Sequence, residues 1–390
     1  MGQERDCGKL TRELKRSQRD PPPLHVKIVN TESKGGVPMF NATRRVLWAG
    51  LWLGALVFEA GGFGQNYISI IVVPHVPGSP AHQTFPYSIN EQGVIAGYYT
   101  FGSGLTPHGF VRATDGTITP FDPPGVPVSG TFAFSINAAG AITGYYVGGT
   151  FPFTNHGFVR SPEGNFVFFD PPGSTSTTAV SINGGGAITG YYFDASNVKH
   201  GFVRSADGTL TSFDPPGSTA TTAVSVNASG AIAGYDEVKD ITHGFVRQPN
   251  GTFVTFDPPE STGTTVQGIN NAGVITGYYT VASGQKIGFV RAADGTITSF
   301  QAGFSTFPTS INAAGAVTGS YVDSSGTSGQ NFVRAPDGSI TSFVPLPTPV
   351  LGFFCGGSAF PTSINNNGAI VGWCFTGVPN PSIIGFARFQ

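Results

Sequence analysis

This chain of 390 residues is long enough for two or three average domains, although single all-β domains often exceed about 200 residues. Its 56 glycines, its 33 phenylalanines and a charged fraction of only 11% favour turn-dense β-structure over long helices. Residues 66–390 contain 10 Lys and Arg against 16 Asp and Glu, and this net charge of −6 excludes the dense basic surface on which nucleic-acid binding depends.

The region near the amino terminus has the pattern of a secretory signal. Arg44 and Arg45 precede a mostly apolar run, Val46–Phe58, and small residues suited to a signal peptidase follow it. The run is shorter than the roughly 20 residues that cross a bilayer, which disfavours the alternative of a membrane anchor. We therefore expect a secreted, periplasmic or cell-surface protein of a bacterium, with no stable membrane span once the signal is removed.

The predicted signal divides the chain into three parts. Residues 1–38 are largely polar and precede Met39, so we interpret them as an extension upstream of the true start or as a disordered leader. Residues 39–65 form the predicted signal peptide, and residues 66–390 form the predicted mature protein.

The mature region contains seven copies of a triplet that reads Ser-Ile-Asn or a close variant, 42 to 53 residues apart. A period of this length, with four short strands in each unit, is typical of a β-propeller blade. We therefore predict an all-β fold, a seven-bladed β-propeller of four-stranded antiparallel blades. The triplets end at Asn90, Asn137, Asn183, Asn227, Asn270, Asn312 and Asn365.

Each repeat predicts two hairpins. The triplet ends the first strand, and a turn such as NAAG leads into a second strand such as AITGYY. A glycine in this second strand indicates close approach of another backbone, which we place at the crowded centre of the ring. The third strand reads HGFVR and the fourth reads TLTSFD, joined by a short turn with glycine in its last position. The glycines of the second strands are Gly97, Gly144, Gly190, Gly234, Gly277, Gly319 and Gly372.

The second hairpin places a histidine of the third strand opposite an aspartate of the fourth. With Asp207 at the centre of the turn, the register pairs His200 with Asp214. The same register pairs His108 with Asp122, His156 with Asp170 and His243 with Asp257.

These four pairs contain two of the three groups of a catalytic triad, yet their distribution favours a structural role. Histidine and aspartate disappear together in the last three repeats, as expected for a cross-strand ion pair or hydrogen bond. A catalytic site would be single rather than copied from blade to blade. We therefore interpret the pairs as structural and assign no catalytic residue.

An arginine ends the third strand in all seven repeats. Its persistence indicates packing and hydrogen bonding between strands or blades, and the alternative is a ring of cations that binds an anion. The seven residues are Arg112, Arg160, Arg204, Arg247, Arg291, Arg334 and Arg388.

The two ends of the mature chain are predicted to close the ring. The last repeat supplies only three strands, and an additional strand, Tyr67–Val73, precedes the first repeat. This strand would complete the last blade and leave no open sheet edge.

Function is expected at the long connections of the repeats, because variable loops on a rigid scaffold carry most binding groups. The acids there could flank a glycosidic bond as acid and base, hold Ca²⁺ with backbone carbonyls, or be solvated charges. The sequence has no contiguous metal motif, nucleophile elbow or phosphate-binding loop, so we predict no metal or cofactor. The five acids that the repeat does not dictate are Asp194, Asp236, Glu237, Asp240 and Asp323.

Two cysteines, Cys355 and Cys374, lie close together in the last repeat. In an exported protein they could form a disulfide, and the alternative is two small buried residues.

The HGFVR segments, in glycine-punctuated units that follow a signal, resemble a bacterial family of probable extracellular repeat proteins, the HAF family, named for its His-Ala-Phe motif. The likeness covers roughly residues 67–390, with glycine in place of the family's alanine. The resemblance implies an extracellular location and propeller-like repeats, and it implies no particular activity.

Together these patterns predict a monomeric secreted propeller that acts as a binding or structural module. Its partner would be a polysaccharide or a surface protein. The alternative is a carbohydrate-active enzyme, a hydrolase or lyase, that uses carboxylates of the long connections.

Overall fold

The computed structural model describes residues 59–62, 65–70, 83–101, 106–126, 128–149, 153–324, 329–345, 355–376 and 383–389. Every regular element in these ranges is a β-strand, which confirms the all-β prediction. The predicted leader, residues 1–38, and most of the predicted signal peptide lie outside them. The described strands all belong to the unit formed by residues 44–390.

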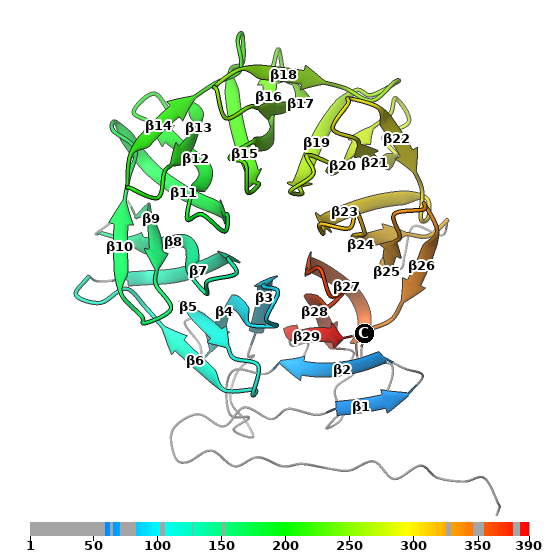
Figure 1. The fold of residues 1–390 in the computed structure, drawn as a ribbon, viewed down its shortest axis with the longest axis horizontal. Helices are drawn as coiled ribbons and strands as arrows, with labels where there is room; N and C mark the ends of the chain where they lie inside the picture. The colour runs from blue at the N-terminus through cyan, green and yellow to red at the C-terminus, as the bar shows by residue number, and fades with distance from the viewer. Residues whose placement is uncertain are drawn as a thin grey trace, which may run out of the picture. The chain divides into compact units, whose positions relative to one another are not determined.

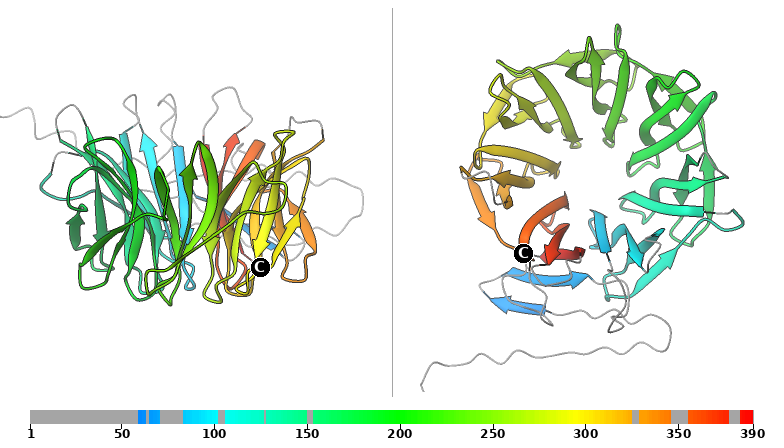
Figure 2. Two further views of the ribbon diagram at one scale, coloured as in Figure 1. Left: turned by 90° about the horizontal axis from the view of Figure 1, so that it is seen from above. Right: turned by 180° about the vertical axis from the view of Figure 1, so that it is seen from behind.

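Within this unit, the repeats stand side by side around a common axis (Figure 1, Figure 2). The innermost strands are β3 (Gln83–Ile89), β7 (Val128–Ile136), β11 (Ser174–Ile182), β15 (Ala220–Val226), β19 (Gly263–Ile269), β23 (Ser305–Ile311) and β27 (Cys355–Ile364). The second strands are β4 (Ile95–Phe101), β8 (Ile142–Gly148), β12 (Ile188–Asp194), β16 (Ile232–Val238), β20 (Ile275–Thr280), β24 (Val317–Val322) and β28 (Ile370–Thr376).

The outer half of each repeat follows the second strand. The third strands are β5 (Thr106–Arg112), β9 (Thr154–Arg160), β13 (Lys199–Arg204), β17 (Ile241–Arg247), β21 (Lys286–Arg291), β25 (Gly329–Arg334) and β29 (Ile383–Phe389). The fourth strands are β6 (Ile118–Phe121), β10 (Phe166–Phe169), β14 (Leu210–Phe213), β18 (Phe253–Phe256), β22 (Ile297–Phe300) and β26 (Ile340–Phe343). Repeats are numbered from repeat 1 (β3–β6) to repeat 7 (β27–β29).

Repeats 2 to 6 each form a separate four-stranded antiparallel sheet, as predicted. Repeats 1 and 7 belong to one nine-stranded sheet, because a parallel bridge joins Ile383 of β29 to Gln83 of β3. The other pairings in this sheet are antiparallel. On one side of the bridge the strands follow one another in the order β27, β28, β29, β2, β1, and on the other side in the order β3, β4, β5, β6.

The amino-terminal strand β2 (Gln65–Ile70) pairs with the last strand of the chain. Tyr67 lies opposite Arg388 in an antiparallel ladder. This is the partner predicted for the strand at Tyr67–Val73, although the observed strand begins two residues earlier and residues 71–73 lie outside the described part of the chain.

A further strand, β1 (Glu59–Gly62), covers the other edge of β2. It falls inside the predicted signal peptide, residues 39–65. Cleavage after residue 65 would therefore remove β1 and retain nearly all of β2.

The second-strand glycines accommodate a β-bulge. A Cβ on Gly97 would overlap the carbonyl oxygen of Phe85, which faces it where the register shifts between Pro86 and Ser88. The corresponding glycines of the other six repeats meet the carbonyl oxygens of Phe132, Thr178, Thr222, Thr265, Phe307 and Phe360. The predicted close approach is confirmed, but the approaching backbone is the neighbouring strand of the same sheet rather than the centre of the ring.

The hydrophobic core lies between consecutive repeats. One cluster joins Ala96 and Phe121 of repeat 1 to Ile142 and Phe158 of repeat 2. Another joins Val371 of repeat 7 to residues of repeat 1 in the same way. Each repeat contributes one phenylalanine with no exposed surface, namely Phe110, Phe158, Phe202, Phe245, Phe289, Phe332 and Phe386.

The Ser-Ile-Asn triplet links each repeat to the next. Asn137 Oδ1 accepts the Ala141 N–H of its own turn at 2.9 Å, while Asn137 Nδ2 donates to the carbonyl of Asn183 at 3.1 Å. Ser135 Oγ accepts the backbone N–H of Ile182 at 3.3 Å. The triplet therefore supplies a turn cap and two bonds to the following repeat.

The amide bonds of the seven asparagines form a path that returns to its start. Each Nδ2 donates to the next carbonyl at 2.9–3.2 Å, in the order Asn90, Asn137, Asn183, Asn227, Asn270, Asn312, Asn365 and back to Asn90. All seven side chains are buried. We refer to this path as the asparagine ring.

Candidate functional site

The four predicted His–Asp contacts are present, between a histidine of the third strand and the aspartate that directly follows the fourth strand. Each histidine Nδ1 lies 2.6–2.8 Å from an aspartate Oδ2, in the pairs His108–Asp122, His156–Asp170, His200–Asp214 and His243–Asp257. The side chains of all four pairs are partly exposed to solvent.

A threonine of the following repeat binds the second oxygen of three of these carboxylates. Asp214 Oδ1, for example, accepts Thr221 Oγ1 at 2.5 Å, and Asp122 and Asp257 make equivalent bonds with Thr131 and Thr264. The carboxylate stands between imidazole and hydroxyl, whereas a nucleophilic triad requires the imidazole in the middle. The arrangement therefore joins two strands of one repeat to the first strand of the next.

The other imidazole nitrogen faces a different group in different repeats. His156 Nε2 lies 2.9 Å from Thr154 Oγ1, whereas His200 Nε2 lies 3.5 Å from Asp194 Oδ2. Desolvation alone would lower the pKa of His200, but hydrogen bonds and charge from Asp214 and Asp194 outweigh it and raise the pKa. The two histidines therefore share the aspartate contact at Nδ1 and differ in the group that faces Nε2.

The five predicted acids occupy unlike environments. Asp194 caps a turn, because its Oδ1 accepts the N–H groups of Ser196 and Val198 at 2.8 Å. Asp240 lies in the turn between β16 and β17 with a φ of 64° and is exposed, and Asp323 follows β24 and is half-buried. The described residues contain no group of three or more His, Cys, Asp or Glu arranged to hold a metal ion.

Asp236 differs from the other acids because it lies in the core. Its side chain is 2% exposed, and its Oδ1 is buried without a hydrogen-bond partner. It stands in β16 between Thr221 of β15 and His243 of β17, where repeats 1 to 3 have a buried tyrosine. Burial raises the pKa of Asp236, although the nearby His243 acts in the opposite direction.

The repeated arginines pack between repeats. The guanidinium of Arg204 lies over the ring of Phe169 in the preceding repeat, 5.2 Å from its centroid, and donates to the Ser205 carbonyl at 3.3 Å. Equivalent stacks bring Arg160, Arg247, Arg291, Arg334 and Arg388 over a phenylalanine of the preceding repeat at 4.7–5.1 Å. This geometry supports the packing interpretation over an anion-binding ring.

The second candidate site is a run of aromatic side chains on the inner strands of repeats 7, 1 and 2. Rings stack within a repeat at 4.3–4.7 Å and meet edge to face between repeats at 4.9–5.5 Å. We call this run the aromatic arc; in order, its members are Phe360, Trp373, Phe85, Tyr98, Phe132 and Tyr145. All six side chains are partly exposed.

The same cross-strand positions in repeats 3 to 5 pair a threonine with a tyrosine. These pairs, which we call the polar arc, are Thr178–Tyr191, Thr222–Tyr235 and Thr265–Tyr278. In repeat 6 the position holds Phe307 and Ser320. The inner strands are therefore aromatic over one group of neighbouring repeats and polar over the next.

The phenols of the arcs interact with one another. Burial and the nearby Tyr87, which shares a hydrogen bond with Tyr98, raise the pKa of Tyr98. Burial and the neighbouring phenols of Tyr191 and Tyr87 raise the pKa of Tyr145 to about 12. Burial also raises the pKa of Tyr235. These hydroxyls stay neutral at physiological pH and act as both donors and acceptors.

Lys199 brings a cation to the polar arc. Its Nζ lies 5.3 Å from the centroid of Tyr191 and 5.8 Å from that of Phe193, and it donates to Thr222 Oγ1 at 3.3 Å. The side chain is partly exposed.

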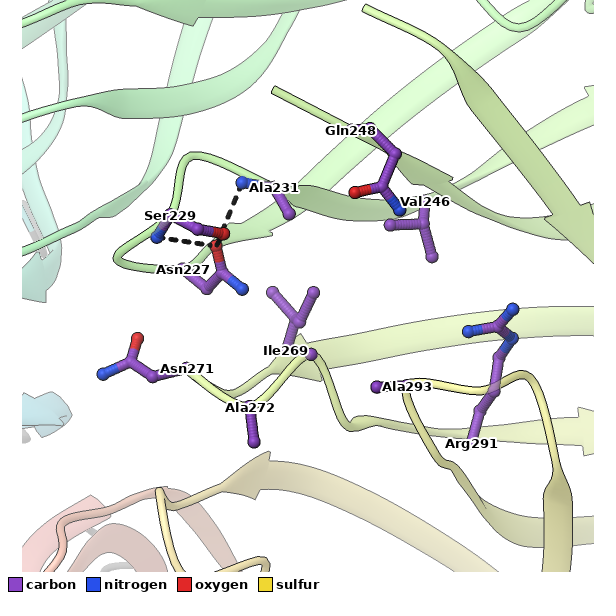
Figure 3. Close-up of a pocket in the computed structure, with 11 residues that line it drawn as sticks. Asn227, Ser229, Ala231, Val246, Gln248, Ile269, Asn271, Ala272, Arg291 and Ala293 are labelled. Atoms are coloured by element: carbon purple, nitrogen blue, oxygen red, sulfur yellow. Dashed lines mark hydrogen bonds between the residues drawn. The ribbon is translucent and has the colours of Figure 1, made fainter. Parts of the chain in front are cut away.

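A hollow of about 240 Å³ lies between the first-hairpin turns of repeats 4 and 5, at the end of the strands away from Lys199 (Figure 3). Two of its side chains already serve the fold, since Asn227 Oδ1 accepts the N–H groups of Ser229 and Ala231 and the Arg291 guanidinium stacks on Phe256. It is smaller than the roughly 300–1,000 Å³ typical of ligand pockets, so it is the weaker candidate.

Cys355 of β27 and Cys374 of β28 are joined by a disulfide, with Cα atoms 5.6 Å apart. The bond links the first two strands of repeat 7, next to the start of the aromatic arc at Phe360 and Trp373.

Sequence comparisons find no matching family model and no matching curated protein. Among the described residues, no helix is long and apolar enough to cross a membrane.

Solved structures with a similar fold do match. A virginiamycin B lyase from Staphylococcus aureus is 15% identical, with a TM-score of 0.51 over 79% of this chain and 95% of that chain. An oligogalacturonate lyase from Vibrio parahaemolyticus is 9% identical, with a TM-score of 0.54 over 86% and 96%. A structure from a study of two prolyl endopeptidases is 8% identical, with a TM-score of 0.55 over 86% and 54%. These neighbours are of β-propeller type, and identities this low establish a likeness of fold alone.

Proposed function

We propose that residues 66–390 form a secreted seven-bladed β-propeller that binds carbohydrate at the aromatic arc. The seven-bladed architecture is supported by one sheet for each of repeats 2 to 6, by the seven-membered asparagine ring, and by β2, which supplies a fourth strand beside β29. In this proposal the threonine bonds to the His–Asp pairs hold neighbouring blades together.

The aromatic arc is the observation that carries the proposed binding function. A sugar ring presents C–H groups on its faces and hydroxyls around its edge, so it is matched by partly exposed aromatic rings beside neutral phenols and threonines. Binding sites commonly combine such an aromatic lining with a few placed polar groups. The stacked pair of Phe85 and Tyr98 and the stacked pair of Phe132 and Tyr145 provide this combination on adjacent repeats.

The repeats supply a matched test of this function. Phe85 and Phe132 occupy positions where repeats 3 to 5 have threonine, so Phe85→Thr and Phe132→Thr remove aromatic faces with a residue that the architecture already accepts. We expect the purified protein to be retained on immobilised polysaccharides and the double variant to lose that retention. Phe168→Thr, at an exposed ring of the outer strand β10, is the control and should bind normally. Equal retention of all three proteins would contradict the proposal.

A carbohydrate-active enzyme is the second candidate, because Asp236 is a carboxyl with a raised pKa beside an imidazole, His243. Release of new reducing ends from the same polysaccharides would reveal cleavage. The enzyme hypothesis requires Asp236→Asn to abolish that release while leaving retention unchanged.

We also propose the predicted export of the protein and its kinship with the extracellular repeat proteins of the HAF family. Mass spectrometry of the protein from its native cells should find a mature terminus near residue 66. Recovery of peptides from residues 1–38 in the exported protein would contradict the proposed leader.

A further inference from the structure

We infer that the carbohydrate bound at the arcs is acidic and that Lys199 contacts its negative charge, an inference that rests on the function proposed above. Lys199 Nζ has aromatic rings and one hydroxyl as neighbours. None of the ion pairs between described residues involves this lysine, so no described carboxylate lies within ion-pair distance of it. A partly buried ammonium of this kind favours an anionic ligand.

Lys286 holds the equivalent strand position two repeats further on. Like Lys199, it begins the third strand of its repeat, and its Nζ donates to Thr280 Oγ1 at 2.6 Å. It too lacks a carboxylate partner within the described residues. Two such cations therefore flank the repeat that contains Tyr235.

The other basic groups of residues 66–390 serve elsewhere. The seven arginines belong to the repeat, and those whose stacks are described above lie against phenylalanine rings between repeats. The third lysine, Lys239, is exposed in the turn between β16 and β17, with a φ of 52°. Lys199 is thus the lysine that contacts the polar arc, and Lys286 holds the equivalent strand position in repeat 5, in a chain segment of net negative charge.

Glu237 limits the class of ligand further. It occupies in repeat 4 the strand position that Phe193 holds in repeat 3 and Thr280 holds in repeat 5, between the two lysines along the chain. A densely charged polyanion would be repelled by the carboxylate of Glu237 while it is attracted by the two lysines. One carboxylate per sugar, as in a uronic-acid polymer, can approach a lysine while the sugar ring lies on the aromatic arc.

The test compares a polyuronate with the same polymer after its carboxyl groups have been reduced to primary alcohols. Retention and dissociation constants are measured for the purified protein and for K199Q and K239Q, which remove the same charge at the arc and at an exposed turn. We expect the unmodified protein to bind the polyuronate about tenfold more tightly than the reduced polymer, as one charge-assisted hydrogen bond provides. K199Q should lose that preference, and K239Q should keep it.

The outcomes separate this inference from the proposed function. Equal binding of both polymers by all proteins would overturn the acidic ligand and leave carbohydrate binding in place. Equal losses in K199Q and K239Q would overturn the role of Lys199, because they would indicate general charge attraction. Binding of neither polymer, with the fold intact by circular dichroism, would overturn both the inference and the function on which it rests.

Discussion

Asp236 gives the sharpest test of the packing described above, through Asp236→Asn. The substitution keeps the shape of the side chain and removes a charge that burial disfavours. Burial disfavours the charged form of this carboxyl, and the neutral amide of asparagine avoids that cost. We therefore expect the free energy of unfolding of D236N, measured by urea denaturation, to exceed that of the parent at pH 7 by an amount on the order of 1 kcal/mol, the usual scale of a single substitution.

The gain in stability from Asp236→Asn should depend on pH, because it depends on the charge of Asp236 in the parent. Because the pKa of Asp236 is raised in the folded protein, the folded state holds the proton more tightly than the unfolded state does. The contribution of Asp236 to stability is therefore fully present below the unfolded pKa, near 3.8, and is lost as pH rises through the folded pKa. The stability difference between D236N and the parent should be small at pH 4 and should grow to a plateau at higher pH.

Asp207→Asn is the matched control. Asp207 is an exposed turn residue whose pKa is lowered, chiefly by the backbone N–H of Thr209, so its substitution should not stabilise the protein as pH rises. A difference between D236N and the parent that stays constant from pH 4 to pH 8 would refute the reasoning. Asp236→Tyr, which restores the tyrosine of repeats 1 to 3 over a histidine, should also stabilise the protein at pH 7.

Three further predictions concern the links between repeats. Asn137→Ala removes a turn cap and one bond of the asparagine ring, and should lower the free energy of unfolding by about 1–3 kcal/mol in urea titrations; an unchanged midpoint would contradict this. Deletion of residues 66–70 from the mature protein exposes the edge of β29 and should lower the melting temperature strongly by calorimetry, whereas an unchanged value would show that β2 does not hold the sheet. His200→Ala should lower the melting temperature slightly and leave polysaccharide retention unchanged; lost retention without a change in melting temperature would argue for a functional role.

Features that depend on local periodicity could be predicted from the sequence. The hairpin register of the third and fourth strands follows from turn chemistry alone, and it places Gly201 opposite Phe213 and His200 beside Asp214, as the structure has them. The partner of the amino-terminal strand followed from a count of strands in the last repeat.

Features that depend on neighbouring repeats could not be predicted in this way. The amide of Asn137 serves its own turn and also a carbonyl 46 residues away, and only the arrangement of repeats around an axis brings the two together. The aromatic arc likewise arises from edge-to-face contacts between repeats. A signal for Asp236 was present in the sequence, because this acid replaces the second tyrosine of a doublet, and in repeats 1 to 3 that second tyrosine is buried at 6–8% exposure.

The asparagine ring has a consequence for how the protein unfolds. In a linear array of repeats, the two terminal units have only one neighbour each, so they fray first and need capping. The bond from Asn365 to Asn90 gives every repeat two neighbours, and no unit is terminal. Opening of any repeat must then break two interfaces at once, which couples the unfolding of each repeat to that of both its neighbours.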